Sequence, residues 1–342
     1  MKKLHILFQH GSDGLPYGCS MIRLLRPLSY PGLHMPYTVT WGTDLPPHPV
    51  DVVIVERLWK PDTTVQQAQA LVQAIRAQGA RLLYTLDDDL LGLPLPGNAL
   101  NAVRLFARHA DGLIVSTAPL AERMRGLNAN CVVVPNQIDD TLFGPSPDLA
   151  LEDRRPVVMG YMGTPTHLHD LLGILAPLRS QLRRHAGQVC LELVGVAESP
   201  AITGLFEGLP VRIKRPEGHV AYDRFVPWMK RELRWDFALA PLSVSPFNRC
   251  KSDLKFLDYG ALGIPGIFSD VTPYKETVQH GVNGLLAADH SGWEACLEQM
   301  ITEPEKRGSL AAAARDHVFT ERCLRVHATD WVEAVARLLQ AA

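Results

Sequence analysis

Two lysines and an aspartate are spaced so that they could act together on an anionic ligand. Lys251, Lys255 and Asp258 lie in the stretch SPFNRCKSDLKFLDYGALGIPGIFS, residues 245–269. If this stretch is helical, Lys251 and Lys255 share a face because they are four residues apart, and Asp258 lies near Lys255. Two ammonium groups and the N–H groups at a helix start can neutralise a diphosphate. The alternative is a solvated face with ordinary lysine–aspartate pairs.

A glycine loop could supply a second anion contact. In GYMGTPTHLHDL, residues 160–171, an apolar run ends at Gly163 and a helical pattern begins near Leu168. Gly163 lets a ligand approach the backbone, Thr164 offers a hydroxyl, and the N–H groups of the helix start favour an anion. The pattern predicts a phosphate cradle, although a glycine after a strand also makes a plain tight turn.

Three consecutive acids follow another apolar run, in TLDDDLLGLP, residues 85–94. Their charges repel one another unless neighbouring groups offset them. One of them, with Asp88 preferred, could orient an acceptor hydroxyl or take its proton. Helix capping and solvation could equally account for all three. A metal site is not expected, because no histidine or second carboxylate cluster stands at ligand spacing.

The elements that must position these residues alternate between short apolar runs and amphipathic stretches. Apolar runs rich in Val, Ile and Leu are typical of strands buried on both faces of a parallel sheet. The alternation stops at residues 145–156, where proline and charge accumulate, and then restarts. Two such series predict two α/β domains, each a doubly wound sheet with ligand sites where strands end and helices begin. The predicted strands are 4–8, 51–56, 81–85, 112–116, 131–135, 156–163, 189–195, 211–214, 236–242 and 265–269, and the predicted helices include 65–79, 99–110, 168–185, 220–234, 252–262 and 293–301.

Composition and charge exclude several other classes of protein. The 342 residues are 46% hydrophobic and 20% charged, and the formal net charge is −2, with one excess acid in each half. A chain without concentrated positive charge is not expected to bind nucleic acid. The chain has no run of about 18 apolar residues, so no membrane-spanning helix is expected. The start MKKLHILFQHGSDG lacks the features of a secretory signal. Six scattered cysteines without a C-x-x-C pair favour a reduced, cytoplasmic protein.

Three stretches of the chain match the motifs of one enzyme family. The first runs from Lys251 to Leu286 and reads K-S-D-L-K-F-L-D-Y-G-A-L-G-I-P-G-I-F-S, then P-Y, then G-V-N-G-L-L. The second, at 134–145, reads V-P-N-Q-I-D-D-T-L-F-G-P, and the third is the loop at Gly163. In this order and spacing they resemble the group 1, family 4-like glycosyltransferases of GT-B fold, in a divergent branch that makes bacterial surface polysaccharides.

The resemblance implies two Rossmann-like domains facing each other across a cleft. It assigns residues 1–148 to acceptor binding and 149–320 to nucleotide-sugar binding, with 321–342 as a helix that crosses back to the N-terminal domain. The implied enzyme moves a sugar from a nucleotide-diphosphate sugar to a glycan, a lipid-linked or another hydroxyl acceptor. It needs no metal or other cofactor and retains the anomeric configuration. The nucleotide base, the sugar, the oligomeric state and peripheral contact with the inner face of the membrane stay open.

The resemblance and the residue spacing together assign a role to each candidate site residue. Gly11, Ser12 and Arg23 follow the first strand, in a loop and helix that face the cleft in GT-B proteins. Glu217 and His219 stand where the family contacts the base. The expected catalytic residues are Asp88 and Lys255, the diphosphate contacts are Gly11, Ser12, Gly163, Thr164, His167, Lys251 and Lys255, the base and ribose contacts are Glu217, His219 and Asp258, and the acceptor contacts are Arg23, Asp87 and Asp88.

The chain departs from the family pattern at the acid that contacts the donor sugar. The family has an E-x7-E pair, and Asp258 matches its second, ribose-binding acid, but Cys250 stands in place of the first. The arginine and lysine that grip the diphosphate near the glycine loop are also missing, and the candidate replacements are His167, His169 and the lysine pair. If the reaction inverts the anomeric centre instead, Asp88 is the candidate base.

Three alternatives to a transferase stay open. The first is a GT-B epimerase, which would convert a nucleotide sugar without an acceptor. The second is an inactive GT-B homologue that binds nucleotide sugars, which the missing acid favours. The third is a two-lobed sugar-binding protein of the periplasmic kind, which the paired lysines and the lack of a signal peptide disfavour.

Overall fold

The chain folds into two compact units. The computed structural model describes residues 1–144, 156–196, 204–218 and 221–340. The N-terminal unit comprises Met1–Asp139, Arg249–Ser252 and the chain from Cys323 onward, and the C-terminal unit comprises Asp140–Asn248 and Asp253–Arg322. The predicted linker at 145–156 lies outside the described residues except for its last residue. The ranges and roles predicted for the two domains stay predictions.

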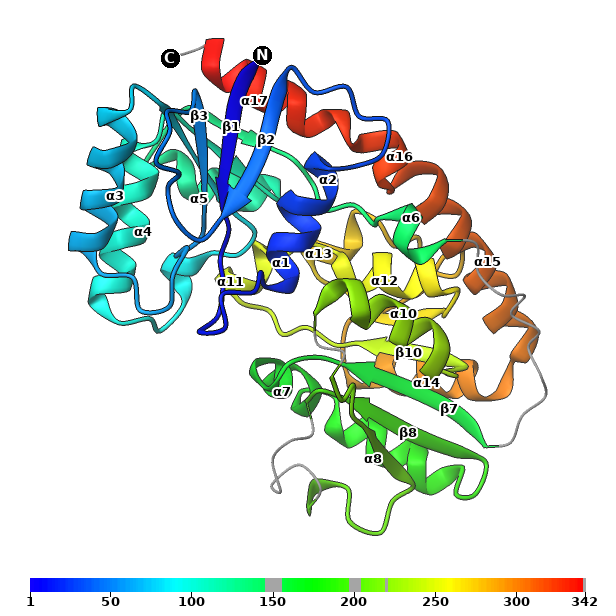
Figure 1. Ribbon diagram of the computed structural model, residues 1–342. Helices are drawn as coiled ribbons and strands as arrows, with labels where there is room; N and C mark the ends of the chain where they lie inside the picture. The colour runs from blue at the N-terminus through cyan, green and yellow to red at the C-terminus, as the bar shows by residue number, and fades with distance from the viewer. Residues whose placement is uncertain (145–155, 197–203, 219–220, 341–342) are drawn as a thin grey trace. The chain divides into compact units, whose positions relative to one another are not determined.

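A parallel sheet forms the centre of the N-terminal unit (Figure 1). In the described residues it has six strands in the order β2-β1-β3-β4-β5-β6. Its strands are β1 Lys2–Leu7, β2 Tyr37–Gly42, β3 Val52–Glu56, β4 Arg81–Leu86, β5 Gly112–Val115 and β6 Cys131–Val133. The apolar runs predicted five of them. β2 was not predicted because it is an edge strand whose residues are mostly exposed, so it carries no buried run.

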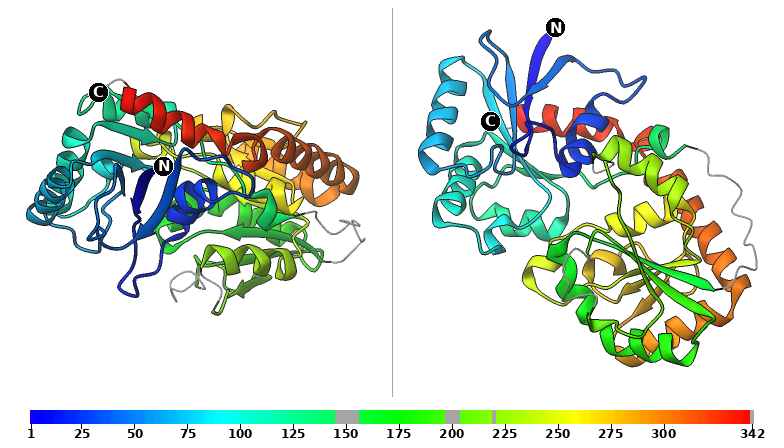
Figure 2. Two further views of the ribbon diagram at one scale, coloured as in Figure 1. Left: turned by 45° about the horizontal axis from the view of Figure 1, so that its top comes forward. Right: turned by 60° about the horizontal axis from the view of Figure 1, so that its bottom comes forward.

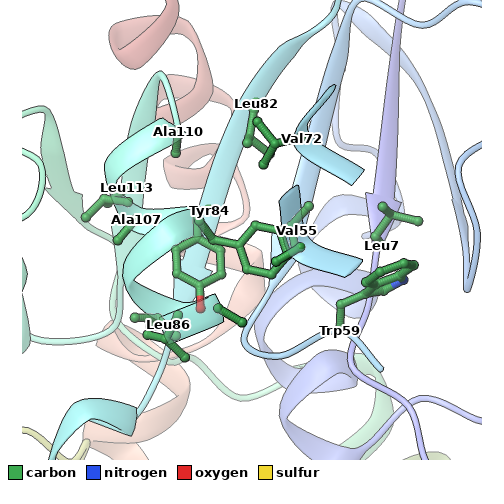
Figure 3. Close-up of a cluster of buried hydrophobic side chains, with 14 of the residues drawn as sticks. Leu7, Val55, Trp59, Val72, Leu82, Tyr84, Leu86, Ala107, Ala110 and Leu113 are labelled. Atoms are coloured by element: carbon green, nitrogen blue, oxygen red, sulfur yellow. The ribbon is translucent and has the colours of Figure 1, made fainter. Parts of the chain in front are cut away.

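Helices cover both faces of this sheet. The described helical segments of the unit are α1 Gly18–Ser20, the π-helical turn η1 Met21–Leu25, α2 Arg26–Leu28, α3 Val65–Ala77, η2 Leu90–Gly92, α4 Gly97–His109, α5 Ala118–Arg125, α16 Leu324–His327 and α17 Thr329–Gln340. On one face, α3, α4 and α5 bury a cluster in which Tyr84 packs beside Val55, Leu86 and Ala107 (Figure 3). The helix α3 begins with a capping box at Thr64, and Gly79 follows its end with φ of +73°.

The C-terminal helix α17 is part of the N-terminal unit's core. It lies along the other face of the sheet, as the red helix beside the blue and cyan strands in Figures 1 and 2. Trp331, Val335 and Leu338 are buried there. A Cβ on Gly112 of β5 would lie 2.7 Å from Leu338, so the absence of a side chain at 112 lets the helix approach the strand closely. The helix α17 therefore completes the same hydrophobic core to which β1 contributes Leu4 and Ile6.

The C-terminal unit contains a second parallel sheet. In the described residues its strands are β7 Val157–Met162, β8 Val189–Val194, β9 Val211–Lys214, β10 Phe237–Ala240, β11 Gly266–Ser269 and β12 Leu285–Ala287. Their order is β12-β11-β10-β7-β8-β9, the arrangement of a Rossmann sheet. The described helices of this unit are α6 Asp140–Phe143, η3 Pro165–His167, α7 Leu168–Leu172, α8 Leu175–Arg184, α10 Tyr222–Glu232, α11 Pro246–Arg249, α12 Leu254–Leu262, α13 Thr272–Lys275, α14 His290–Thr302 and α15 Pro304–Glu321. Two doubly wound sheets confirm the predicted fold class.

The prediction of one continuous helix over residues 168–185 is wrong. The stretch 168–185 forms two helices, α7 and α8, which are separated at Gly173 and Ile174. Pro177 is the reason, because a proline inside one continuous helix would clash with the carbonyl of Gly173. The break places Pro177 in the first turn of α8, where its missing N–H costs nothing.

We predict that Leu338→Ala destabilises the protein by about 2–5 kcal/mol, because the leucine is fully buried against β5 and its removal leaves a cavity. Urea unfolding followed by circular dichroism measures the change. Val326→Ala, at a site 45% exposed on α16, is the control and should change the unfolding free energy by less than about 0.5 kcal/mol. Equal stability of the two variants would contradict the packing described for α17.

Candidate functional site

Each sheet has one point at which its strand order reverses. In the C-terminal sheet this point lies between β7 and β10, and in the N-terminal sheet it lies between β1 and β3. Loops that leave such neighbouring strands in opposite directions open a crevice, where ligands of α/β proteins bind. Gly163 follows β7 directly, and the loop with Gly11 follows β1. Of the predicted site residues, Gly11 and Gly163 therefore lie in loops at the two switch points.

Two loops pack backbone against backbone at the ends of β7 and β8. Gly163 N donates to Val194 O at 3.1 Å, and a Cβ on Gly195 would lie 2.7 Å from Gly163 O. Gly195 has φ of +77°, a conformation that other residues rarely adopt. Thr164 is exposed, with its hydroxyl 2.7 Å from that of Thr166. The loop thus places exposed threonine hydroxyls at the switch point, and the predicted phosphate cradle stays a prediction.

Asp170 is the centre of a polar network that sequence reasoning missed. Its Oδ1 accepts hydrogen bonds from Ser243 N and Ser243 Oγ, both at 2.9 Å, and its Oδ2 lies 3.1 Å from His167 Nδ1. Burial opposes ionisation of Asp170, but His167 and Ser243 outweigh it and lower the pKa of the carboxyl. The predicted anion contact His167 is therefore already held by a carboxylate. The i, i+3 spacing of His167 and Asp170 was the available sequence signal.

The helix α12 brings Lys255 and Asp258 to the same edge of the sheet. Lys255 Nζ donates to the carbonyl of Met162, the last residue of β7, and lies 4.8 Å from the ring centre of Tyr161. Asp258 is one turn further along, and burial raises its pKa to about 7, against the opposing charge of Lys255. Asp258 Oδ1 is inaccessible and has no hydrogen-bond partner among the described residues. The predicted contact of Asp258 with a ribose stays a prediction.

The structure says little about Glu217 and His219, the two residues expected to contact the nucleotide base. Glu217 is exposed on the turn that follows β9, next to Gly218, whose φ is +67°. His219 lies outside the described residues. The predicted contacts of both residues with a base stay predictions.

Arg57 joins the two predicted acids of the N-terminal unit. Its Nη1 lies 2.5 Å from Asp87 Oδ1 and 3.2 Å from Asp88 Oδ2. Lys251 Nζ lies 3.5 Å from the other oxygen of Asp88. Burial opposes ionisation of Asp88, but Lys251 and Arg57 outweigh it and lower its pKa. Asp88 is therefore a weak proton acceptor, better suited to orient a hydroxyl than to deprotonate it.

The backbone of Arg57 is held in a strained conformation. Its φ is +49°, although it is not glycine, and Tyr84 Oη donates to its carbonyl at 2.8 Å. Its N–H donates to Thr85 O at 3.0 Å. Strained residues fixed by surrounding contacts often occur at functional sites. Sequence reasoning missed Arg57, although a charged residue directly after the apolar run 51–56 was a usable signal.

Lys251 and Lys255 do not share a helix face, which corrects the prediction from their spacing. The helix α12 begins at Leu254, so Lys251 precedes it, and residues 249–252 belong to the N-terminal unit. Cys250 is buried in that unit's core, and Thr117 Oγ1 donates to its carbonyl at 2.9 Å. An i, i+4 pattern holds only inside a continuous helix, and here the packing of Cys250 ends it. The predicted diphosphate contact of Lys251 itself stays a prediction.

Arg23 lies inside the N-terminal unit rather than at its surface. It is 2% exposed, its Nη1 donates to Val134 O at 2.5 Å and to Asn136 Oδ1 at 3.1 Å, and its guanidinium lies 5.1 Å from the Trp331 ring. Burial lowers its pKa to about 10. These contacts give Arg23 a structural role that links η1 to α17. Its predicted contact with an acceptor stays a prediction.

Gly11 and Ser12 lie in the loop after β1. Gly11 N donates to Leu15 O at 3.4 Å and Gly11 O accepts from Gly14 N at 3.1 Å, which closes a compact turn. Ser12 is exposed at the tip of this turn. The structure thus places both residues at the switch point of the N-terminal sheet, and their contact with a diphosphate stays a prediction.

Two further observations bear on the class of protein. Across the described residues, no three His, Cys, Asp or Glu side chains are grouped so as to hold a metal ion. No helix in the described part of the chain combines the length and apolar character needed to cross a membrane.

Solved structures share this architecture over nearly the whole chain. HepE of Anabaena, in complex with UDP-glucose, aligns with a TM-score of 0.68 and 16% identity, covering 98% of this chain and 100% of that chain. Sucrose-phosphate synthase from Thermosynechococcus elongatus aligns with a TM-score of 0.61 and 17% identity, covering 86% of this chain and 75% of that one. The protein has the GT-B fold. This confirms the family resemblance at the level of the fold.

Curated relatives of this GT-B protein are glycosyltransferases. D-inositol 3-phosphate glycosyltransferase of Nocardiopsis dassonvillei is 27% identical over 247 residues, which are 66% of this chain and 56% of the relative. The enzyme of the same name from Thermobispora bispora is 29% identical over 120 residues, 30% of this chain and 28% of the relative. The matched part thus spans little more than half of the first relative and less of the second. No protein-family model matches the chain.

We predict that Asp258→Asn raises the melting temperature more at pH 8 than at pH 5. The pKa of Asp258 is raised to about 7 in the folded protein, so its ionisation costs folding free energy that grows as pH rises through this window. Asparagine keeps the shape and has no such cost. Thermal unfolding at the two pH values measures the difference. The exposed Asp223→Asn on α10 is the control, and an equal effect of Asp258→Asn at both pH values would contradict the raised pKa.

Proposed function

We propose that the protein transfers a sugar from a UDP-linked sugar to a hydroxyl acceptor, with the C-terminal unit binding the donor and the N-terminal unit binding the acceptor. The observation that carries the proposal is the group at the switch point of the C-terminal sheet. There, Lys255 reaches the end of β7, Asp258 lies one turn further along α12, and the loop at Gly163 exposes hydroxyls. UDP is the proposed nucleotide because HepE, which shares the fold, has been solved with UDP and with UDP-glucose.

The proposed donor site would bind the nucleotide sugar through two kinds of interaction, a positive charge and hydrogen bonds. Lys255 supplies a cation beside the loop, so it can stabilise the diphosphate as the bond from the sugar C1 to the leaving oxygen breaks. Asp258 is the proposed partner of the ribose hydroxyls, a role that comes from the family resemblance. Because an ammonium group can stabilise the leaving group, the proposed reaction needs no metal ion. Retention of configuration belongs to the proposal through the family resemblance.

The acceptor side would use the acids at the end of β4. Asp87 and Asp88 are fixed by Arg57, and Lys251 contacts the second oxygen of Asp88. Carboxylates held in this way orient a hydroxyl by accepting its hydrogen bond, and the lowered pKa of Asp88 makes it a poor base. The acceptor oxygen would form the new bond to C1 as the bond from C1 to the diphosphate oxygen breaks, and the acceptor's proton would pass to the departing diphosphate of UDP. The acceptor named for the curated relatives, D-inositol 3-phosphate, is the first candidate to test.

We predict that Lys255→Ala weakens UDP binding at least tenfold, since the loss of one charge-assisted contact costs about 1.5–3 kcal/mol. Isothermal titration calorimetry with UDP, GDP and dTDP measures the affinity and identifies the base. Lys306→Ala is the matched control, because Lys306 Nζ also donates to a backbone carbonyl, that of Gly281, in the same unit. If Lys255→Ala binds every nucleotide as the wild type does, the donor site is assigned wrongly.

We predict that the protein releases UDP from UDP-glucose. The rate of release should rise several-fold when a suitable acceptor is added, and it should persist in EDTA. The assay couples UDP release to a colour reaction and starts with D-inositol 3-phosphate, followed by a panel of sugars and polyols. Chromatography of donor-only reactions separates the alternatives, since an epimerase would convert UDP-glucose to an epimer without acceptor. UDP binding with no turnover against any acceptor would instead indicate an inactive homologue, which the cysteine at 250 would then explain.

A further inference from the structure

The loop after β1 is closed at its base by a single buried carboxyl group. β1 and β3 are neighbours, with Leu7 opposite Val55, so Glu56 at the end of β3 lies beside the start of this loop. The segment 9–20 comprises most of this loop and the helical residues Gly18–Ser20 of α1, with which it ends. It occupies the switch point of the N-terminal sheet. Whatever holds its two ends therefore sets the shape of the crevice wall.

Glu56 contacts both ends of the loop with one oxygen. Gln9 N donates to Glu56 Oε2 at 2.8 Å, and Ser20 Oγ lies 2.5 Å from the same oxygen. Ser20 Oγ also lies 3.0 Å from Gln9 O, and Tyr17 N donates to Gln9 O at 3.1 Å. Glu56 is 1% exposed and Ser20 is fully buried. The three residues thus form a closed cluster that ties residue 9 to residue 20.

Counting protons in this cluster favours a neutral Glu56. The Ser20 hydroxyl has one hydrogen, but both Glu56 Oε2 and Gln9 O lie within its reach. If Glu56 carries a proton and donates it to Ser20, then Ser20 can donate to Gln9 O and each contact has its own hydrogen. Glu56 Oε1 is buried and has no partner among the described residues, so a full charge there would be poorly stabilised.

The charged or titratable neighbours of Glu56 come from four parts of the unit. Arg57 follows it in the chain, Asp87 follows β4, Arg23 lies on η1 and Cys19 lies on α1. Burial is the largest influence and raises the pKa of Glu56 to about 7, with Asp87 adding to the rise and Ser20, Gln9 N–H and Arg57 opposing it. This agrees with the proton count. The cluster therefore changes its hydrogen bonding near neutral pH.

We propose that Glu56 is the positioning residue of the loop 9–20: by holding Gln9 and Ser20 at one carboxyl group, it fixes the segment that presents Gly11 and Ser12 at the switch point. The role of this segment in binding substrate rests on the proposed function. The holding of the loop by Glu56 does not, because it follows from contacts within the N-terminal unit alone.

Hydrogen–deuterium exchange of the full chain, measured by mass spectrometry, tests the proposal without a substrate. In Glu56→Ala we expect amides in peptides spanning residues 8–20 to exchange at least tenfold faster, while peptides from β3 and β4 exchange as in the wild type. Ser20→Ala removes one contact and should accelerate the same peptides by a smaller factor. The exposed Glu333→Gln on α17 is the control. Wild-type exchange over 8–20 in both Glu56→Ala and Ser20→Ala would overturn the proposal.

The pH dependence separates positioning by Glu56 from loss of packing. In the wild type, protection of residues 8–20, corrected for intrinsic exchange, should fall as pH rises from about 5 to 7 and then level off, because an opened loop lets Glu56 ionise. Glu56→Gln keeps an acceptor oxygen but cannot titrate, so its protection should be flat over this range. A pH profile shared by wild type and Glu56→Gln would overturn the proposal. Calorimetry with UDP reports on the donor site separately, so failure of UDP binding would count against the proposed function only.

Discussion

Asp88 receives a cation at each of its two oxygens, Arg57 at one and Lys251 at the other. The contact with Lys251 exists only because residues 249–252 pack within the N-terminal unit, although the chain on both sides of them belongs to the C-terminal unit. The burial of Cys250 in the N-terminal core anchors that segment. The arrangement of the acids at the end of β4 thus depends on a stretch of chain more than 160 residues away in sequence.

A parallel sheet explains why the polar groups gather where they do. Both faces of each sheet are covered by helices, so the strands are almost wholly apolar and carry few functional side chains. Polar groups of the candidate site stand at the carboxyl ends: Glu56 ends β3, Arg57 follows it, and the aspartates at 87 and 88 follow β4. The same rule places Lys255 at the end of β7, through α12. The chemistry of each unit is therefore concentrated at one edge of its sheet.

The strands and the fold class could be predicted from sequence because buried parallel strands leave unbroken apolar runs. The exceptions have local causes. Neither β2, a partly exposed edge strand, nor β12, which is only three residues long, was predicted, and Pro177 divides the helix predicted at 168–185. The residues of the candidate site were harder to predict from the sequence than the fold was. Lys255, Asp258, Gly163 and the acids at 87 and 88 were predicted from local patterns and the family resemblance, and their roles stay predictions. Arg57 depends on a strained backbone and Glu56 on a pairing between strands, which no local pattern shows. Asp170 gains its partners from Ser243, more than 70 residues away. No local pattern records such contacts.

The C-terminal helix has a consequence for the order in which the two units can form during synthesis. The N-terminal sheet leaves one apolar face uncovered until α17 has emerged from the ribosome, because Trp331, Val335 and Leu338 fill that side of its core. The C-terminal unit needs no residue beyond Arg322. The unit that is translated second can therefore complete its core first, which reverses the usual vectorial order of folding. Until then the nascent N-terminal half exposes the part of this apolar face that α17 covers.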